Sequence, residues 1–402
     1  VGGGLGEAEV GGPHINIIPR SGGNTFAGQA FAQAAGDWSR SNNIDDELRS
    51  FGITEPEALR SAWDVSGSYG GPIKRDRLWF YGNVRNYGDA TVRPTAIGPN
   101  IHAGDPNSWA YEEDTSFEEV RDVNGRDIFS GRVTAQLGNS RVGFSQEYQN
   151  RCDGTTRTRE GDGCRQPGEN WTGLGTNSAF GSSSAEADAG ILPLPYYLTQ
   201  ATWTLPVTNR LLLEAGFSRL QYVPGFGQVP SDGIFDLIPV TEQSRIDGHP
   251  SNFTYRAIDD YLKNKANPNN FRASASYVTG SHAMKFGYQH GYDIADFNNF
   301  YNQTRVNYRF DNGVPNRFTM QLGNWRTKNR TNHYGLYAQD QWTINRFTLQ
   351  GAVRYERAWS WFPEGQGWDG PDKFHADPIT FPRTEGVPGF NDIMFRGGIA
   401  WD

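Results

Sequence analysis

Two cysteines are the residues whose types and spacing most directly suggest a chemical bond. Cys152 and Cys164 are the only cysteines in the sequence, and they flank the polar stretch DGTTRTREGDG. An even number of cysteines in an oxidising compartment is typical of a disulfide, which here would restrain the enclosed loop by roughly 3 kcal/mol. Metal binding by the pair is a weaker alternative because no histidine lies nearby, and redox catalysis is weaker still because the spacing is not Cys-x-x-Cys. We therefore expect a disulfide.

A second group of side chains has the chemistry of cation ligands. The stretch GWDGPDKFHAD offers the oxygen and imidazole groups of Asp369, Asp372, His375 and Asp377. We favour the alternative of a solvated polar loop, so no metal site is predicted. The stretch DVNGRD from Asp122 has a faint likeness to a calcium loop but lacks the later glutamate, and we interpret it as a turn.

Catalytic and nucleotide-binding motifs are not evident in the sequence. We find no nucleophile elbow, no HExxH and no paired carboxylates, and the N-terminal VGGGLGEAEVGG is neither preceded by a strand nor followed by Lys-Ser/Thr. Close backbone packing is a better explanation of these glycines. We expect no enzyme activity and no cofactor. An outer-membrane hydrolase is the alternative, and it would need a signature serine with a companion histidine on adjacent strands.

Charge and hydropathy narrow the classes further. A net charge of -8 without a basic stripe argues against a nucleic-acid partner. The mean hydropathy is -0.67 and no apolar run approaches the length of a membrane helix, which excludes helical spans but not spanning strands. One segment, 45–62, has a plausible helical pattern.

Paired strands are the elements that must position any functional residues. Apolar and polar residues alternate on both sides of short turns in five stretches, which predicts antiparallel hairpins. The turns are KRDR from Lys74, GNS from Gly138, PVTN from Pro206, TGSH from Thr279 and TIN from Thr343. About a dozen strands are expected in all.

Long polar connections alternate with these short turns. They are expected over residues 36–62, 89–125, 153–194, 224–269, 295–332 and 360–392. Compact soluble domains rarely hold structureless loops beyond about 15 residues, whereas outer-membrane barrels combine short periplasmic turns with long extracellular loops. A soluble sandwich or propeller is the alternative, but no blade motif recurs and sandwich loops are short. We therefore predict an all-β, antiparallel transmembrane β-barrel.

The two faces of the expected strands suit a barrel wall. The polar residues expected to line a wet interior are Arg132, Gln136, Glu147, Glu214, Lys285, Gln350, Arg354 and Glu356. The aromatic residues expected at the membrane interfaces are Trp79, Tyr81, Trp203, Trp342, Tyr355 and Trp359.

The N-terminal stretch GGPHINIIPRSGGNTFAGQAFAQ closely resembles the junction between plug and barrel in TonB-dependent receptors. Residues 16–19 match the last plug strand, 21–24 the Ser-Gly joint and 26–31 the opening of the barrel. SYGGPIKRDRLWFYGNV from Ser68 resembles the second and third barrel strands of the Oar-like branch of this family. YGLYAQDQWTINRFTLQGAVRYE and FRGGIAWD follow in the expected order.

The resemblance implies a fold and a function. Such receptors are Gram-negative outer-membrane barrels of about 22 strands, with a plug that closes the lumen. We expect residues 1–24 to be the C-terminal end of the plug domain with the junction, and residues 25–402 to be the N-terminal part of the barrel. The TonB box, most of the plug and about half of the strands fall outside this sequence. We therefore view the chain as part of a receptor.

The resemblance further implies transport energised by a TonB-type inner-membrane complex, with the ligand bound between extracellular loops and plug. A non-transporting adhesion or assembly component, whose large loops bind a partner protein, is the alternative. The expected ligand-facing loop residues are Phe297, Phe300, Tyr301, Trp359, Trp361 and Trp368, since flat rings beside amides suit sugars or peptides. Lipopolysaccharide contact or packing between loops suits them equally. Siderophore, glycan, peptide and vitamin all remain open as substrates.

Overall fold

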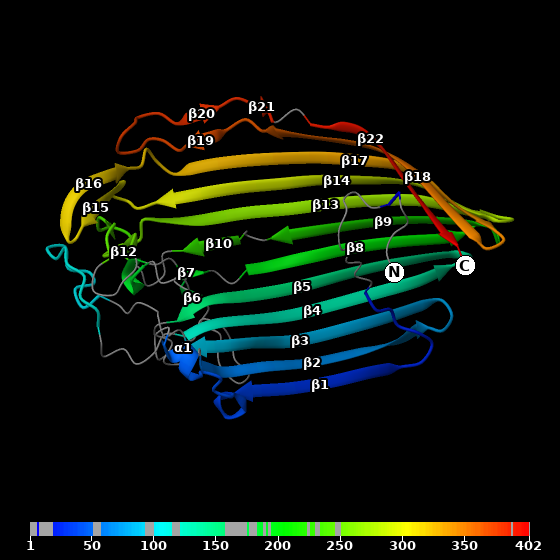
Figure 1. Ribbon diagram of the computed structural model, residues 1–402, viewed down its shortest axis with the longest axis horizontal. Coiled ribbons are helices and arrows are strands. Elements are labelled where there is room, and N and C mark those ends of the chain that lie inside the picture. The colour runs from blue at the N-terminus through cyan, green and yellow to red at the C-terminus, as the bar shows by residue number, and fades with distance from the viewer. Residues whose placement is uncertain are drawn as a thin grey trace.

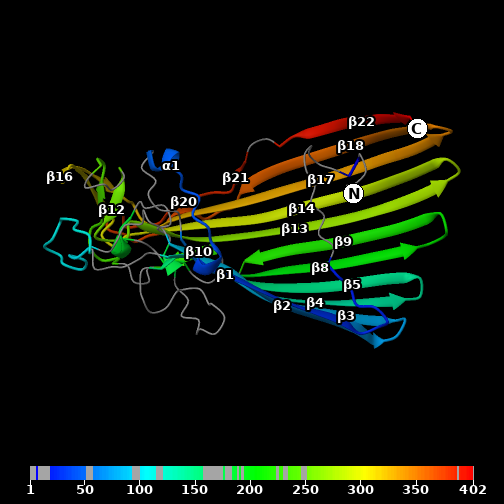
Figure 2. The ribbon, with the colours of Figure 1, turned by 60° about the horizontal axis from the view of Figure 1, so that its bottom comes forward.

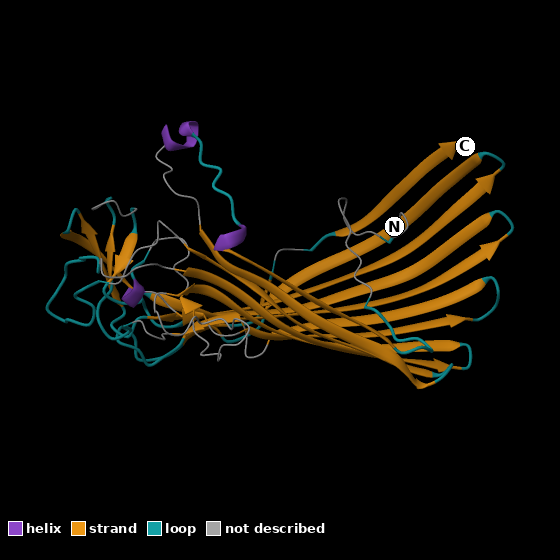
Figure 3. Cartoon of the chain, turned by 90° about the horizontal axis from the view of Figure 1, so that it is seen from below, coloured by secondary structure: helices purple, strands orange, loops and turns teal. Residues whose placement is uncertain are grey.

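The computed structural model describes residues 6–7, 19–50, 58–92, 100–114, 121–156, 175–176, 183–187, 190–191, 194–222, 226–229, 234–245, 251–386 and 389–401. Within these residues, long neighbouring strands form one curved antiparallel sheet (Figures 1 and 3). In spatial order they are β1 (Ala27–Gly36), β2 (Ala58–Lys74), β3 (Leu78–Val92), β4 (Arg121–Leu137), β5 (Ser140–Thr156), β8 (Leu194–Pro206), β9 (Leu211–Tyr222), β13 (Asp260–Thr279), β14 (His282–Tyr301), β17 (Trp325–Ile344), β18 (Phe347–Phe362) and β22 (Asn391–Trp401). This set matches the dozen strands expected from the sequence.

The tight turns that join the long strands in pairs lie at one end of the large sheet, and the long connections lie at the other (Figures 1 and 2). Gly138, Gly280 and Asn345 have positive φ in the turns that join β4 to β5, β13 to β14 and β17 to β18. Two-residue hairpin turns require this backbone conformation, which glycine and asparagine adopt at low cost. The predicted asymmetry of the connections is therefore confirmed.

The sheet has an inner face, which we define as the face contacted by residues 6 and 7, and an outer face on the opposite side. Pairing places Arg132, Glu147, Glu214 and the other polar residues expected to line the interior on the inner face. The outer face carries exposed apolar side chains. They include Val65, Val84, Phe129, Phe144, Phe271, Phe286, Leu336, Val353, Phe395 and Ile399. Because one face is polar and the other apolar, the wall suits a barrel in lipid with a wet lumen.

Two of the expected interfacial aromatics lie on the other face. Tyr81 pairs with Arg132 and shares the inner face with it, and Trp79 shares that face two residues away. The indole of Trp79 donates a hydrogen bond to Asn24 Oδ1 (2.8 Å) instead of meeting lipid. Trp342 and Tyr355 lie on the outer face, as expected.

A small second sheet lies at the loop end. Its strands are β12 (Phe253–Tyr255), β11 (Val240–Glu242), β15 (Val306–Asp311) and β16 (Val314–Met320), in that order. Its buried apolar core consists of Val240, Phe253, Tyr255 and Phe310, with Tyr111 and Tyr308 packed against it. We call this sheet and the described segments around it, residues 100–114, 234–245, 251–259 and 302–324, the cap.

Short strands and helices complete the loop end. They are η1 (Asp37–Ser39), α1 (Asp46–Ser50), β6 (Gly175–Thr176), η3 (Ala185–Ala187), β7 (Gly190–Ile191), β10 (Phe226–Val229), β19 (Gln366–Trp368), β20 (Ile379–Phe381) and β21 (Thr384–Glu385). No helix in the described part of the chain is long and apolar enough to cross a membrane.

Three local expectations were wrong. The helix expected over 45–62 is limited in the described residues to α1, and β2 already begins at Ala58. The stretch DVNGRD, interpreted as a turn, is part of β4. The connections expected over 224–269, 295–332 and 360–392 all contain strands. The first contains β10, β11, β12 and the start of β13, the second the ends of β14 and β17 with β15 and β16, and the third β19, β20 and β21. In each case pairing with neighbouring strands overrides the local preference of the sequence.

Candidate functional site

Residues 6 and 7 lie against the inner face of β14, β17 and β18. The Glu7 carboxylate forms an ion pair with Lys285 and accepts a hydrogen bond from the Tyr337 hydroxyl (3.2 Å). The backbone carbonyl of Glu7 accepts a hydrogen bond from the Gln289 amide (3.1 Å). A segment more than 270 residues away in sequence is thus held by side chains that the sequence places on the polar face.

Gly6 adds two backbone contacts to this group. Its N–H donates to Gln339 Oε1 (2.8 Å), and its carbonyl accepts from Arg354 Nη1 (3.1 Å). The Arg354 side chain is 1% exposed and also donates to Glu356 (2.6 Å), so its charge is compensated. We call Gly6, Glu7 and their partners on the wall the inner-wall contact.

Glycines on the wall make room for the large side chains of this contact. A Cβ atom at Gly287 would lie 2.2 Å from Tyr337 Cζ, and one at Gly335 would lie 2.3 Å from Arg354 Nη2. The Tyr337 ring and the Arg354 guanidinium therefore lie flat over the backbone of a neighbouring strand. Any larger residue at either glycine would push them away.

The predicted joint, Ser21 to Asn24, lies at the turn end of β2, β3 and β4. Asn24 Oδ1 accepts hydrogen bonds from the backbone N–H of Asp76 (2.9 Å) and from Trp79. Arg132 donates to the carbonyl of Pro19 (3.2 Å). A Cβ at Gly22 would lie 2.1 Å from the carbonyl oxygen of Phe80, so only glycine fits this close approach. The division into plug and barrel at residue 24 remains a prediction.

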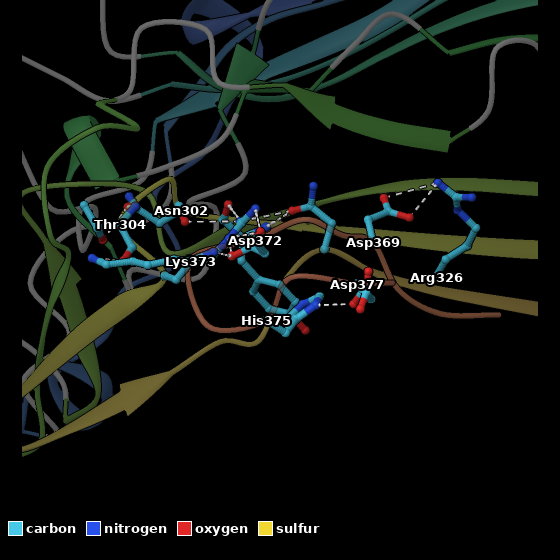
Figure 4. Close-up of polar contacts among 11 residues, drawn as sticks. Asn302, Thr304, Arg326, Asp369, Asp372, Lys373, His375 and Asp377 are labelled. Atoms are coloured by element: carbon cyan, nitrogen blue, oxygen red, sulfur yellow. Dashed lines mark hydrogen bonds and ion pairs between the residues drawn. The ribbon is translucent and has the colours of Figure 1, made fainter. Parts of the chain in front are cut away.

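The cap is fastened to the neighbouring connection by a bidentate ion pair between Arg305 and Asp372. Figure 4 labels Asp372 among its neighbours. Arg305 Nη2 donates to Asp372 Oδ2 (2.6 Å) and Nε donates to Asp372 Oδ1 (3.0 Å), while Nη1 donates to the carbonyl of Tyr301 (2.7 Å). Burial tends to raise the pKa of Asp372, but the hydrogen bonds from Arg305 and from the backbone N–H of Lys373, together with the neighbouring positive charge, outweigh it, and the pKa lies below its usual value. We call this pair the clasp.

The candidate cation ligands are engaged by other partners, and the clasp is one of these contacts. Asp372 is occupied by Arg305, Asp369 pairs with Arg326 (3.2 Å), and His375 Nδ1 contacts the backbone carbonyl of Asp377 (2.7 Å; Figure 4). Among the residues that the structure describes, no three or more His, Cys, Asp or Glu side chains gather as metal ligands. The four residues do not converge on one point.

The expected ligand-facing aromatics are divided between the two faces. Strand pairing places Phe297 and Tyr301 on the inner face of β14, and Phe300, Trp359 and Trp361 on the outer face. Each of three has an aromatic neighbour: Phe300 stacks on Tyr261, Trp359 meets Tyr334 and Trp361 meets Tyr292.

Trp368 of β19 lies beside Trp325 of β17, with ring centroids 4.3 Å apart. These side chains therefore do not form one site, and their contact with a ligand remains a prediction. Cys164 lies outside the described residues and the Cys152 side chain is likewise not described, so the disulfide also remains a prediction.

The cap contains aromatic and charged residues that sequence reasoning did not select. The Arg256 guanidinium lies 4.0 Å from the centre of the Trp109 ring. It donates to the backbone carbonyls of Pro106, Ser108 and Ile238 at 2.7 to 2.9 Å. The Tyr255 hydroxyl donates to the carbonyl of Trp109 (2.9 Å). The sequence signal was a tryptophan and a tyrosine close together in the polar stretch NSWAYEED.

Comparison with known proteins shows which barrels this chain is similar to. Residues 235–402 match the family model described as TonB dependent receptor-like, beta-barrel. The TonB-dependent transporter Oar of Myxococcus xanthus is 24% identical over 417 residues, which cover 85% of this chain and 37% of Oar. The chain thus spans well under half the length of this curated relative.

Two solved structures share the fold. The ferric yersiniabactin uptake receptor FyuA from Yersinia pestis aligns with a TM-score of 0.51 and 12% identity, over 96% of this chain and 45% of FyuA. The outer membrane transporter YddB from Escherichia coli aligns with a TM-score of 0.50 and 12% identity, over 86% of this chain and 42% of YddB. Together with the sequence matches, they confirm the expected barrel fold and the location in the Gram-negative outer membrane.

Proposed function

We propose that this chain, a TonB-dependent receptor-like β-barrel segment of the outer membrane, works in energised uptake of a ligand that is bound by extracellular loops and plug. The observation that carries the proposal is the inner-wall contact. A segment that precedes the sheet in sequence is held against the polar face of a curved wall, as a plug would be. Energised uptake requires that such a segment can move.

The chemistry of the inner-wall contact suits a movable segment. The contacts described there are hydrogen bonds and an ion pair between Glu7 and Lys285, and none of them is a contact between apolar side chains. Hydrogen bonds of this kind contribute about 1 kcal/mol each, because water replaces them when they break. A force applied by a TonB-type inner-membrane complex could break them one after another. The apolar outer face would meanwhile remain in contact with membrane lipid and lipopolysaccharide.

Adhesion or assembly without transport is the second candidate function. It is favoured by the apolar side chains that β16 exposes at the loop end, Val314, Phe318 and Met320, which are 56 to 62% exposed. Exposed apolar residues on a strand at the edge of a sheet are typical of surfaces that bind a partner protein.

Movement at Gly6 separates the two functions. The intact receptor would carry Gly6→Cys with Cys152 and Cys164 replaced by serine, and cells in their growth medium would be treated with a membrane-impermeant maleimide. Uptake predicts that Gly6→Cys is labelled severalfold faster in energised cells than after an uncoupler abolishes the proton gradient. Val314→Cys on the exposed hairpin is the matched control and should be labelled equally in both conditions.

A disulfide that fixes residue 6 to the wall tests the same movement by preventing it. A Cβ at Gly6 would lie 3.3 Å from Tyr337 Cβ, close to the separation found in disulfides. The double variant Gly6→Cys/Tyr337→Cys should therefore form a cross-link. Until a reductant is added, its labelling by the maleimide should not depend on the proton gradient. Equal labelling of Gly6→Cys with and without the gradient would instead favour adhesion.

A further inference from the structure

A cavity of about 370 Å³ lies in the cap, between the small sheet and the segment 100–114. Five aromatic side chains line it: Trp109, Tyr111, Phe253, Tyr255 and Phe310. Neither the resemblance to receptors nor the comparisons assign a site here. We propose that this cavity binds an uncharged, planar aromatic group of an extracellular ligand.

Two segments far apart in sequence build the walls. Tyr111 lies edge-on to Phe253, with ring centroids 4.7 Å apart and an angle of 80° between the ring planes. Trp109 stacks on Tyr308 at 5.3 Å. Aromatic pairs in such arrangements contribute about 0.5–1.5 kcal/mol beyond the area that they bury. Both ends of the cavity are therefore fixed by ring contacts before a ligand arrives.

Hydrogen bonds hold the Trp109 wall in place. The Arg256 side chain is buried, and its guanidinium is fixed to three backbone carbonyls while it lies against the indole ring. The Tyr255 hydroxyl donates to the carbonyl of Trp109 itself. Burial raises the pKa of Tyr255, so this hydroxyl stays protonated and keeps donating. A preformed wall lowers the entropic cost of binding.

The charges beside the cavity are already compensated. The Glu242 carboxylate is 2% exposed and accepts hydrogen bonds from the backbone N–H groups of Ser244, Asn312 and Gly313 at 2.9 to 3.0 Å. It closes the turn between β15 and β16 instead of facing a cation. A charged ligand would therefore find no strong partner among the lining residues described.

Size and polarity then select the class of ligand. Ligand cavities are commonly about 300–1,000 Å³, and a cavity of about 150 Å³ holds benzene, so this one has room for a bicyclic ring. A sugar would need several hydrogen-bonding partners around its ring. Since the polar groups of Glu242, Tyr255 and Arg256 are engaged, an aromatic group fits better than a sugar.

The test uses the intact receptor in lipid nanodiscs, with 5-fluoroindole as the probe and fluorine NMR as the readout. Empty nanodiscs correct for partitioning into lipid. The expected result is saturable binding, which Ala110→Trp weakens at least tenfold because Ala110 lines the cavity and a larger side chain would fill it. Trp38→Ala removes an indole that is 80% exposed in another connection and should leave binding unchanged.

Three outcomes would overturn the proposal: linear binding without saturation, unchanged binding in Ala110→Trp, or saturable binding of methyl glucoside at the same site with equal or higher affinity. Trp109→Phe serves as a second variant that keeps a ring in the wall, and it should weaken binding less than Ala110→Trp. Binding is measured without a proton gradient, so its result is independent of the labelling of Gly6→Cys.

Discussion

At the scale of the residue, the clasp shows how one ion pair can organise a long connection. Arg305 reaches Asp372 across 67 positions of sequence, and both side chains are largely buried, 13 and 10% exposed. Removing one partner of a buried pair leaves the other charge without compensation, which costs more than the loss of an exposed pair.

Asp372→Asn should loosen the cap at neutral pH. The variant is expected to lose about 2 kcal/mol of local stability, because a hydrogen-bonded charge is lost. The pKa of Asp372 is lowered below 3.8 in the folded chain, so the stabilisation is present above about pH 4 and disappears as the pH falls through the lowered pKa. Hydrogen exchange of the backbone amides from 302 to 305 measures this stabilisation. As the pH falls below about 4, these amides should lose protection in the unsubstituted chain but not in Asp372→Asn.

Asp369→Asn is the matched control for the clasp. Asp369 lies on the same connection and pairs with Arg326, but the two side chains are 49 and 44% exposed. Exposed pairs contribute about 0–1 kcal/mol. If both variants changed protection at 302–305 to the same extent, the clasp would not be the contact that fastens the cap.

The sequence allowed only part of this site to be predicted. Asp372 was recognised as a polar group in a loop, but its partner was not, because no local pattern connects residue 372 to Arg305. The same holds for Trp109, whose wall depends on Arg256 and Tyr255. Contacts between connections are set by the path of the chain above the sheet, which periodicity does not encode.

At the scale of the element, the alternation of apolar and polar residues predicted strands only where the two faces of the sheet meet different surroundings. β4, β5 and β18 were found from apolar and polar residues that alternate near the turns. β13 and β14 each contain 20 residues, and their far parts carry polar residues on both faces, such as Asn264, Lys265 and Asn298. Once both faces meet water the alternation stops, so these extensions were interpreted as loops.

Gly287→Ala should destabilise the wall through its neighbouring strand. Its Cβ would meet the Tyr337 ring, which must then move away from Glu7. Overpacking of this kind costs about 1–3 kcal/mol. The denaturant midpoint of the intact receptor refolded in liposomes would measure the loss, and labelling of Gly6→Cys should become faster in the same background.

Gly351→Ala provides the control for this prediction. Gly351 lies on the outer face of β18, and nothing lies within 4 Å of the position that its Cβ would take. Its substitution should leave the midpoint nearly unchanged. Equal losses in the two variants would mean that backbone flexibility, and not the Tyr337 ring, determines the effect.

At the scale of the whole molecule, the difference between the faces defines the surroundings of the sheet. The outer face exposes large apolar side chains from β2 to β22, whereas the inner face holds the inner-wall contact. In the described residues, β1 and β22 each pair with one long neighbour and not with each other, so the wall is open between them.

Val353→Arg tests which face meets hydrocarbon. Val353 lies six residues beyond Phe347 at the turn end of β18, which corresponds to roughly half the height of an apolar band of about 25 Å. An arginine facing lipid at that depth costs about 2–4 kcal/mol. Gln350→Arg, three residues away on the inner face, should cost little. Folding yield in liposomes, read from heat-modifiable mobility on gels, compares the two variants.

The length of β13 and β14 has a further consequence. A strand of 20 residues is about 65 Å long, and a tilted strand needs only about half of that to cross the apolar band. The aromatic cavity in the cap therefore lies some tens of ångströms above the bilayer, far from Glu7. A small molecule cannot contact the cavity and Glu7 at the same time. Its uptake would therefore need two binding sites, used one after the other. If the cavity in the cap bound the ligand too tightly, slow dissociation would delay its transfer to the inner-wall contact. Binding in the cavity would therefore work best with modest affinity and rapid release.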